Sequence, residues 1–465
     1  MRKGATGLSV PKIEKLMGIE VYATVSSGIG GVIRQSVEDF VVEEVLVDGS
    51  KAEINQPVTH QVLGSSPVKN RYLLCVLVKR NWDNFQAIRR VAEQLGIKFG
   101  QVQIAGIKDA KAVTAQHITI EGVSAEEIQK VQVKDIEIRP IGYFRSKLSS
   151  YFLLGNNFHI SIKTISHPKS TIKKRITKTI KELEAISGIP NFFGHQRFGT
   201  TRPITHLVGK AIVKENFRKA VMLFLAKPSP QEHPESRQAR EQLQATQEFK
   251  QALKNFPRQL YYEHLMLKHL AKKPDDFTGA FRRLPIKLRE LFPQAYQSYL
   301  FNKFLSRRIE NKIPLNRAEV GDYTVNVERS GLPMQMMRRI ASAQTLAEIN
   351  DAVKAGKMRL ALPLVGFKQR PSQGVQGEIE RQILENEGVS PENFKIEAML
   401  EISSRGELRT IVTPLNNFSL NKIPDDSANL SKQKVKVGFM LYRGSYATVL
   451  LRELMKPRNP IKTGF

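Results

Sequence analysis

At 465 residues the chain is too long for one compact core, so we expect two or more domains, and 41% hydrophobic residues indicate a folded globular protein. Lys and Arg number 72 against 44 Asp and Glu, a formal net charge of +28, which predicts a polyanionic partner. No apolar run approaches the ~20 residues of a membrane span, and the basic N-terminus lacks the apolar core of a secretion signal, so we expect a cytoplasmic protein without a membrane partner.

Strand-like segments alternate with two helical patterns between residues 29 and 199, which indicates an α/β or α+β domain. The first helix follows Asn81 and is expected to bury Phe85, Ile88, Ala92 and Leu95 before Gly96 ends it. The second buries Ile172, Ile176, Ile180 and Leu183. Its outer face carries Lys173, Lys174, Arg175, Lys178 and Lys181, which form either a solvated face or contacts to phosphate.

The segment "IAGIKDAKAVTAQHITI", residues 104–120, places one acid between two apolar, strand-like runs. Asp109 is therefore expected on a connecting loop, beside Lys108 and Lys111. An Asp in such a loop often initiates the turn by accepting backbone hydrogen bonds. A catalytic carboxylate is the alternative, and other parts of the chain must decide between the two.

A second unusual loop is "PNFFGHQRFGTTRP", residues 190–203, which fits neither an amphipathic helix nor an alternating strand. Its aromatics could plug a core. In a basic protein they could instead stack on an unpaired base beside Arg197 and Asn191. Residues 201–391 then become helical in pattern, and the tail from Val435 to Lys456 returns to a strand, a glycine turn and a helix.

Both loops resemble motifs of the tRNA pseudouridine synthase D (TruD) family. "NFFGHQRFG" is similar to NxFGxQRFG, and "AGIKDAKAVTAQ" to the family's GxKDxxAVTxQ segment. Further similarity lies, in the family's order, in "GIGGVIRQSVEDFVVEE", "RSKLSSYFLLGNNFHISI", "AYQSYLFN" and "YRGSYATVLLRELM". The resemblance implies an α/β (α+β) pseudouridine synthase core with a mixed or antiparallel sheet flanked by helices. It implies core residues 1–200 and 395–465, interrupted by a helix-rich inserted domain at 201–394.

The resemblance also implies a reaction. Pseudouridine synthases cleave the N1–C1′ bond of a uridine, turn the uracil and rejoin it through C5, with one essential aspartate, here Asp109. That carboxylate either attacks C1′, as in a retaining glycosidase, or abstracts a sugar proton to give a glycal. By family analogy the substrate is the uridine at position 13 in the D arm of tRNA. The reaction requires no cofactor, and one Cys and nine His without HExxH or CxxC spacing predict no metal site.

Supporting residues follow from motif position. Arg34 occupies the place of a basic residue expected to pair with the aspartate, Phe193 the aromatic expected to pack on the target base, and Asn191 the polar residue that orders the site. Further candidates, either core residues or RNA contacts, are Phe40, Gln196, Arg197, Tyr446 and Arg452. Candidate phosphate contacts are Lys108, Lys111, Lys173, Lys174 and Arg175.

The expected protein is thus a monomeric tRNA pseudouridine synthase. The alternative is a non-catalytic RNA-binding protein or tRNA chaperone that kept the fold. The intact Asp109 segment favours the enzyme, because a pure binder needs no cation-paired acid.

Overall fold

The computed structural model describes residues 9–55, 62–421 and 432–465. The chain forms two compact units, each assembled from separate stretches. Unit 1 comprises Met1–Val25, Ala185–Glu328 and Pro333–Val412, and unit 2 comprises Ser26–Glu184, Arg329–Leu332 and Thr413–Phe465. The division predicted at 200/201 and 394/395 stays a prediction.

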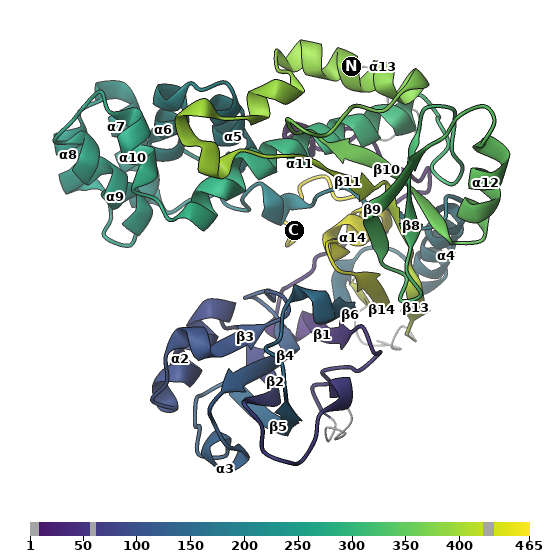
Figure 1. Cartoon of the computed structure of the whole chain (residues 1–465), viewed down its shortest axis with the longest axis horizontal. Helices are drawn as coiled ribbons and strands as arrows, with labels where there is room; N and C mark the ends of the chain where they lie inside the picture. The colour runs from purple at the N-terminus through teal and green to yellow at the C-terminus, as the bar shows by residue number, and fades with distance from the viewer. Residues whose placement is uncertain (1–8, 56–61, 422–431) are drawn as a thin grey trace. The chain divides into compact units, whose positions relative to one another are not determined.

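Unit 2 is built on a mostly antiparallel sheet in the order β13-β14-β6-β1-β4-β2-β5, with β3 paired to β4 (Figure 1). Strands β1 and β4 pair in parallel, with Val41 opposite Val113. This mixed sheet with flanking helices confirms the predicted fold class. The strands are β1 (Phe40–Leu46), β2 (Tyr72–Arg80), β3 (Val102–Ile104), β4 (Val113–Glu121), β5 (Ile136–Phe144), β6 (Leu153–Ile165), β13 (Asn416–Leu420) and β14 (Gln433–Tyr442).

The helices of unit 2 are α2 (Asn84–Gln94), α3 (Ala125–Ile128), α4 (Lys169–Ala185) and α14 (Ala447–Met455). Both predicted helices are confirmed as α2 and α4, and the predicted strand and helix of the tail as β14 and α14. Helix α2 is capped by the Asp83 side chain, which accepts from the backbone N–H of Phe85 and Gln86. The prediction that α2 buries Phe85 was wrong, because Phe85 is 47% exposed. Ala87 and Val91 lie on the buried face instead.

Unit 1 combines a group of helices with a second sheet. Figure 1 shows α5–α10 gathered beside one half of the long helix α11, and their apolar side chains share one core. The helices are α1 (Lys12–Leu16), α5 (Thr205–Val213), α6 (Phe217–Ala226), α7 (Pro234–Thr246), α8 (Phe249–Asn255), α9 (Tyr261–Leu270), α10 (Phe277–Arg282), α11 (Ile286–Glu310), α12 (Leu346–Lys354) and α13 (Gly374–Glu387).

The second sheet was not predicted from the helical pattern of this region. Its order is β11-β10-β8-β9, all antiparallel, and α11 and α12 both pack on β10. The strands are β8 (Tyr323–Val327), β9 (Pro333–Ile340), β10 (Met358–Leu364) and β11 (Glu407–Thr410). A separate two-stranded pair joins β7 (Ile189–Pro190) and β12 (Val412–Thr413).

Candidate active site

The sheet of unit 2 brings Asp109, Arg34 and Lys79 together at one end of its strands. Arg34 precedes β1 and Asp109 precedes β4. Because these strands are parallel neighbours, their N-terminal ends lie side by side. Lys79 lies at the C-terminal end of β2, which runs antiparallel to β4 and pairs Lys79 with Thr114. Three groups that are far apart in the sequence are thereby assembled by strand order.

Asp109 lies on the loop between β3 and β4, as predicted. Its Oδ1 accepts a hydrogen bond from Arg34 Nη2 at 3.0 Å, which is the expected ion pair. The carboxylate side chain keeps 21% exposure while the Arg34 side chain keeps 10%. The acid is therefore held by a cation and still open to a substrate.

Arg34 is itself held in place from several sides. Its guanidinium carbon lies 4.0 Å from the centroid of the Phe40 ring, and its Nη1 donates to the carbonyl of Gly464 at 3.3 Å. The residue adopts a φ of +57°, a left-handed conformation that costs free energy in a residue other than glycine and recurs at functional sites. Burial lowers the pKa of the Arg34 guanidinium, and the Asp109 carboxylate opposes that shift.

The ring of Phe40 packs against the Arg34 guanidinium. Its ring is 1% exposed and meets Phe158 edge to face at 6.2 Å. The buried ring therefore carries the Arg34 guanidinium, which favours the core alternative for Phe40 over a contact with RNA.

Lys79 is a functional candidate that the sequence analysis missed. Its fully buried Nζ donates to the backbone carbonyls of Asp109 at 2.6 Å and Trp82 at 2.8 Å. Burial lowers its pKa to about 8, against the raising effect of the Asp109 carboxylate. One signal was present in the sequence: Lys79 continues the apolar run "YLLCVLV", where a charged residue in a buried strand needs a partner.

The prediction that Lys108 contacts phosphate was wrong. Its side chain is 3% exposed, and its Nζ forms an ion pair with Glu44 on β1, whose side chain is 0% exposed. The second Glu44 oxygen accepts from the backbone N–H of His117 at 3.0 Å. Burial acts to raise the pKa of Glu44, but Lys108 and His117 outweigh it, and the pKa of the carboxyl falls below its usual range. Lys108 therefore fixes the loop to β1 instead of reaching solvent.

The other basic candidates of unit 2 separate into two groups. Lys111, Lys173 and Lys174 are exposed, as a phosphate contact requires. Arg175 is half-buried, and its Nη1 donates to the Gly28 carbonyl at 2.6 Å and lies 2.8 Å from His167 Nε2. Those contacts give Arg175 a role in anchoring α4.

Two C-terminal candidates also differ in exposure. Arg452 on α14 is 1% exposed and forms an ion pair with the neighbouring Glu453 at 2.9 Å, which favours the core alternative over a contact with RNA. Tyr446 is half-buried at the N-terminal end of α14, and its contact with RNA stays a prediction.

The predicted aromatic loop belongs to unit 1, where it is tied to β11. The Asn191 side chain donates to the Thr410 carbonyl at 3.0 Å, and its oxygen accepts from Arg409 Nη2 at 2.7 Å. Arg409, which the sequence analysis missed, lies 4.0 Å over the ring of Phe193. Phe193 is 7% exposed, so a base could reach only a small part of its ring.

Two further loop residues lie on the short helical turn that follows. Arg197 donates to Ser298 Oγ at 3.0 Å and to Gln294 Oε1 at 3.4 Å, both on α11. Gln196 is exposed. Arg197 is thus fixed to α11, while Gln196 faces solvent and stays a predicted RNA contact.

Within the described residues no cluster of three or more His, Cys, Asp or Glu side chains is arranged to hold a metal ion. Among the same residues, no helix has the length and apolar character to cross a membrane.

Comparison with known proteins agrees with the motifs. The family model of tRNA pseudouridine synthase D (TruD) matches residues 16–454. A protein of Methanosarcina mazei named "Probable tRNA pseudouridine synthase D" is 39% identical over 456 residues, covering 98% of this chain and 100% of the relative. A protein of the same name in Thermococcus gammatolerans is 35% identical over 431 residues, covering 92% and 95%.

The fold gives the same result. A crystal structure of a Methanosarcina mazei protein that carries the TruD name superposes with a TM-score of 0.81 at 39% identity, covering 96% of this chain and 98% of that one. Sequence and fold agree along almost the whole length, and the chain belongs to the tRNA pseudouridine synthase D family.

Proposed function

We propose that this protein isomerises uridine to pseudouridine in tRNA, at position 13 of the D arm, with Asp109 as the catalytic residue and no cofactor. The observation that carries the proposal is the Asp109 carboxylate, paired with Arg34 at 3.0 Å and partly open to solvent at the sheet edge. A structural turn residue would not need this buried cation.

The reaction places specific demands on that carboxylate. The N1–C1′ bond breaks, a C5–C1′ bond forms, the proton on C5 leaves and N1 gains a proton, so substrate and product have the same atoms. Whether Asp109 attacks C1′ or removes a sugar proton, it must be ionised and held still. Arg34 favours the ionised form, and Lys79 fixes the backbone of the loop.

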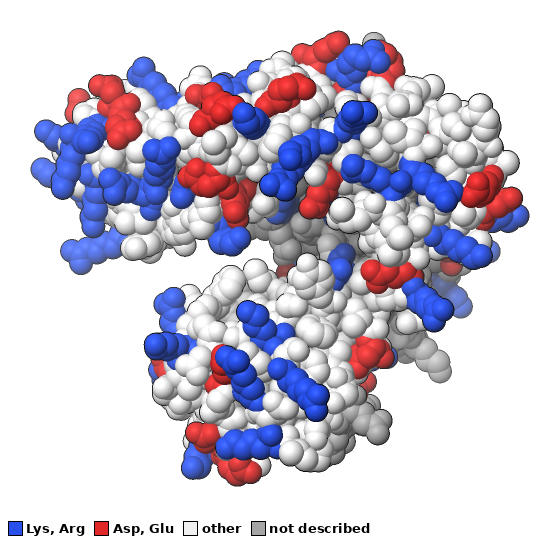
Figure 2. All heavy atoms as spheres, in the orientation of Figure 1, with Lys and Arg blue, Asp and Glu red and all other residues white. Residues whose placement is uncertain are grey.

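Surface charge supports an RNA substrate. Figure 2 shows Lys and Arg side chains gathered at the end of the helical part of unit 1, over α8 and α9. Exposed basic residues there are Lys250, Lys254, Arg258, Lys268, Lys272 and Lys273. Such a surface binds phosphates without regard to sequence, and each phosphate contact offsets part of the few kcal/mol needed to flip a nucleotide out of the stack.

The test is Asp109→Asn, which keeps the size of the side chain and removes its charge. We expect pseudouridine to disappear from tRNA transcripts while tRNA binding and the melting temperature stay unchanged. The matched control is Asp135→Asn: Asp135 is exposed in the same unit, and its φ of +61° is one that Asn accepts.

Turnover by Asp109→Asn would refute the catalytic assignment. The site of modification is tested separately with a transcript that carries cytidine at position 13. Pseudouridine that still forms in that transcript would refute position 13 and leave the role of Asp109 untouched.

A further inference from the structure

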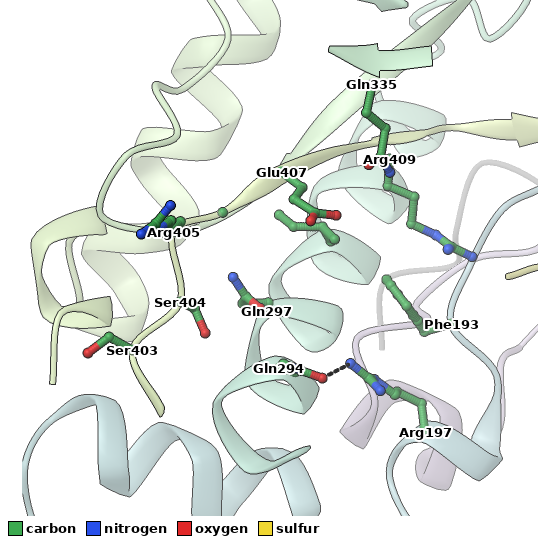
Figure 3. Close-up of a pocket in the computed structure, with 12 residues that line it drawn as sticks. Phe193, Arg197, Gln294, Gln297, Gln335, Ser403, Ser404, Arg405, Glu407 and Arg409 are labelled. Atoms are coloured by element: carbon green, nitrogen blue, oxygen red, sulfur yellow. Dashed lines mark hydrogen bonds between the residues drawn. The ribbon is translucent and has the colours of Figure 1, made fainter. Parts of the chain in front are cut away.

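Unit 1 contains a polar pocket with a cavity volume of about 440 Å³, within the size range of small-molecule and nucleotide sites. Five segments line it: the aromatic loop, the first half of α11, strand β9, the end of strand β10 and the chain from Ser403 through β11. Figure 3 shows the side chains of Gln297, Glu407 and Phe193 around the same hollow. All its lining residues belong to unit 1.

Two of the four charged residues that line the pocket already have partners within the protein. Arg409 stacks on Phe193 and bonds to Asn191, and Arg197 bonds to α11. Arg405 and Glu407, by contrast, are exposed, and in the described part of the chain their side chains make no hydrogen bond or ion pair. An unpaired cation and an unpaired acid two residues apart, on one wall of a pocket, leave binding capacity for a ligand that carries both a negative group and N–H donors.

The neutral polar residues add to that capacity. Gln297 donates through Nε2 to the Val365 carbonyl at 2.6 Å, which fixes its amide and leaves Oε1 as an acceptor. Gln335 on β9 is exposed and makes no hydrogen bond through its side chain within the described residues. Leu364 supplies an apolar part of the wall, and Phe193, which is expected to pack on the target base, borders the pocket.

We propose that this pocket binds one unpaired nucleotide of the RNA substrate other than the uridine that is isomerised. Arg405 takes its phosphate, and Glu407, with the amides of Gln297 and Gln335, reads N–H donors and acceptors on the edge of its base. The inference rests on the proposed function, since it assumes an RNA substrate. A ligand with only negative charge is disfavoured by Glu407, and a cationic ligand by the three Arg residues.

The decisive experiment uses the sign of a charge effect. Glu407→Gln removes a negative charge from a protein that binds a polyanion. If Glu407 lies near the bound RNA without contacting a base, its loss removes repulsion and tRNA binds more tightly to the variant. If Glu407 accepts hydrogen bonds from a base edge, tRNA binding by the full-length variant weakens, by roughly fivefold or more. The control is Glu385→Gln, an exposed acid on α13 in the same unit.

Arg405→Ala tests the phosphate contact. We expect roughly tenfold weaker tRNA binding and a log-log salt slope smaller by about one unit. Lys354→Ala, an exposed cation on α12, should leave both values unchanged. Unchanged binding by Arg405→Ala, or tighter binding by Glu407→Gln, would overturn the proposal.

A photo-crosslinking residue in place of Gln335 identifies the occupant. Crosslinking to a single unpaired nucleotide other than the isomerised uridine supports the proposal, whereas crosslinking to that uridine, to scattered positions or to none refutes it. Titration with each 5′-mononucleotide tests whether the pocket is instead a site for a free nucleotide. If Arg405→Ala abolishes the binding of a mononucleotide but leaves tRNA binding unaltered, the proposal is refuted too. The turnover of Asp109→Asn is measured alongside these variants. Its loss depends on the proposed function alone, so a failure of the proposed function can be told apart from a failure of the pocket proposal.

Discussion

The Nζ atom of Lys79 donates to the backbone carbonyl oxygen of Asp109 at 2.6 Å, which ties the loop of the proposed catalytic acid to strand β2. The hydrogen bond fixes the backbone of the loop and leaves the carboxylate to Arg34. Lys79 is therefore a positioning residue for Asp109, and its protonation should be visible in the stability of the protein.

Burial lowers the pKa of Lys79 from 10.5 to about 8, with Asp109 and Asp83 opposing the shift and Lys108 adding to it. Between these two values the unfolded chain holds more protons than the folded one, so the free energy of unfolding rises with pH. Relative to Lys79→Met, the wild-type protein should gain about 2 kcal/mol between pH 7 and pH 9.5. Chemical denaturation at both pH values measures the difference, and a difference that stays constant with pH would contradict a lowered pKa.

Arg34→Met removes the cation beside Asp109 and its stacking on Phe40. We expect kcat to fall roughly a hundredfold, since a misplaced catalytic group costs about that much, while KM for tRNA changes little. Arg34→Lys should restore part of kcat, because it returns the charge without the planar fork. The control is Arg90→Met on the exposed face of α2. A rise in KM with normal kcat would show that Arg34 binds RNA and does not position Asp109.

The buried pair of Glu44 and Lys108 predicts a stability effect. Either Glu44→Gln or Lys108→Met alone leaves one buried group without its partner and should cost roughly 3–5 kcal/mol. The double variant should cost clearly less than the sum of the two, because neither charge is then left alone. Thermal unfolding of the four proteins provides the comparison. If the losses of stability in the two single variants simply add in the double variant, the two groups do not interact. If Lys108→Met weakens tRNA binding at normal stability, Lys108 is a phosphate contact after all.

The basic surface over α8 predicts a salt effect. If Lys250 and Lys254 each neutralise a phosphate, replacing both with Gln should reduce the log-log salt slope of tRNA binding by about two units. Filter binding between low and physiological salt measures the slope, with Lys354→Gln on α12 as the control. A slope equal to that of the wild-type protein would mean that the RNA does not reach α8.

Local patterns in the sequence determined several elements correctly. The spacing of Ile172, Ile176, Ile180 and Leu183 predicted α4, whose apolar face is buried, because a helical period is a local property of the chain. The glycine and the apolar runs around Asp109 predicted its loop for the same reason. The ordered motifs, which extend over most of the chain, predicted the family.

The partners of Asp109 were decided by the tertiary structure. Arg34 is 75 residues away in sequence, and it meets Asp109 because β1 and β4 pair in parallel, a choice that no local pattern encodes. Lys108 was expected to contact phosphate from its loop, and only the approach of β1 buries it against Glu44. Strand alternation and helical period report which side of an element is apolar, whereas the identity of the neighbouring element depends on strand order across the whole sheet.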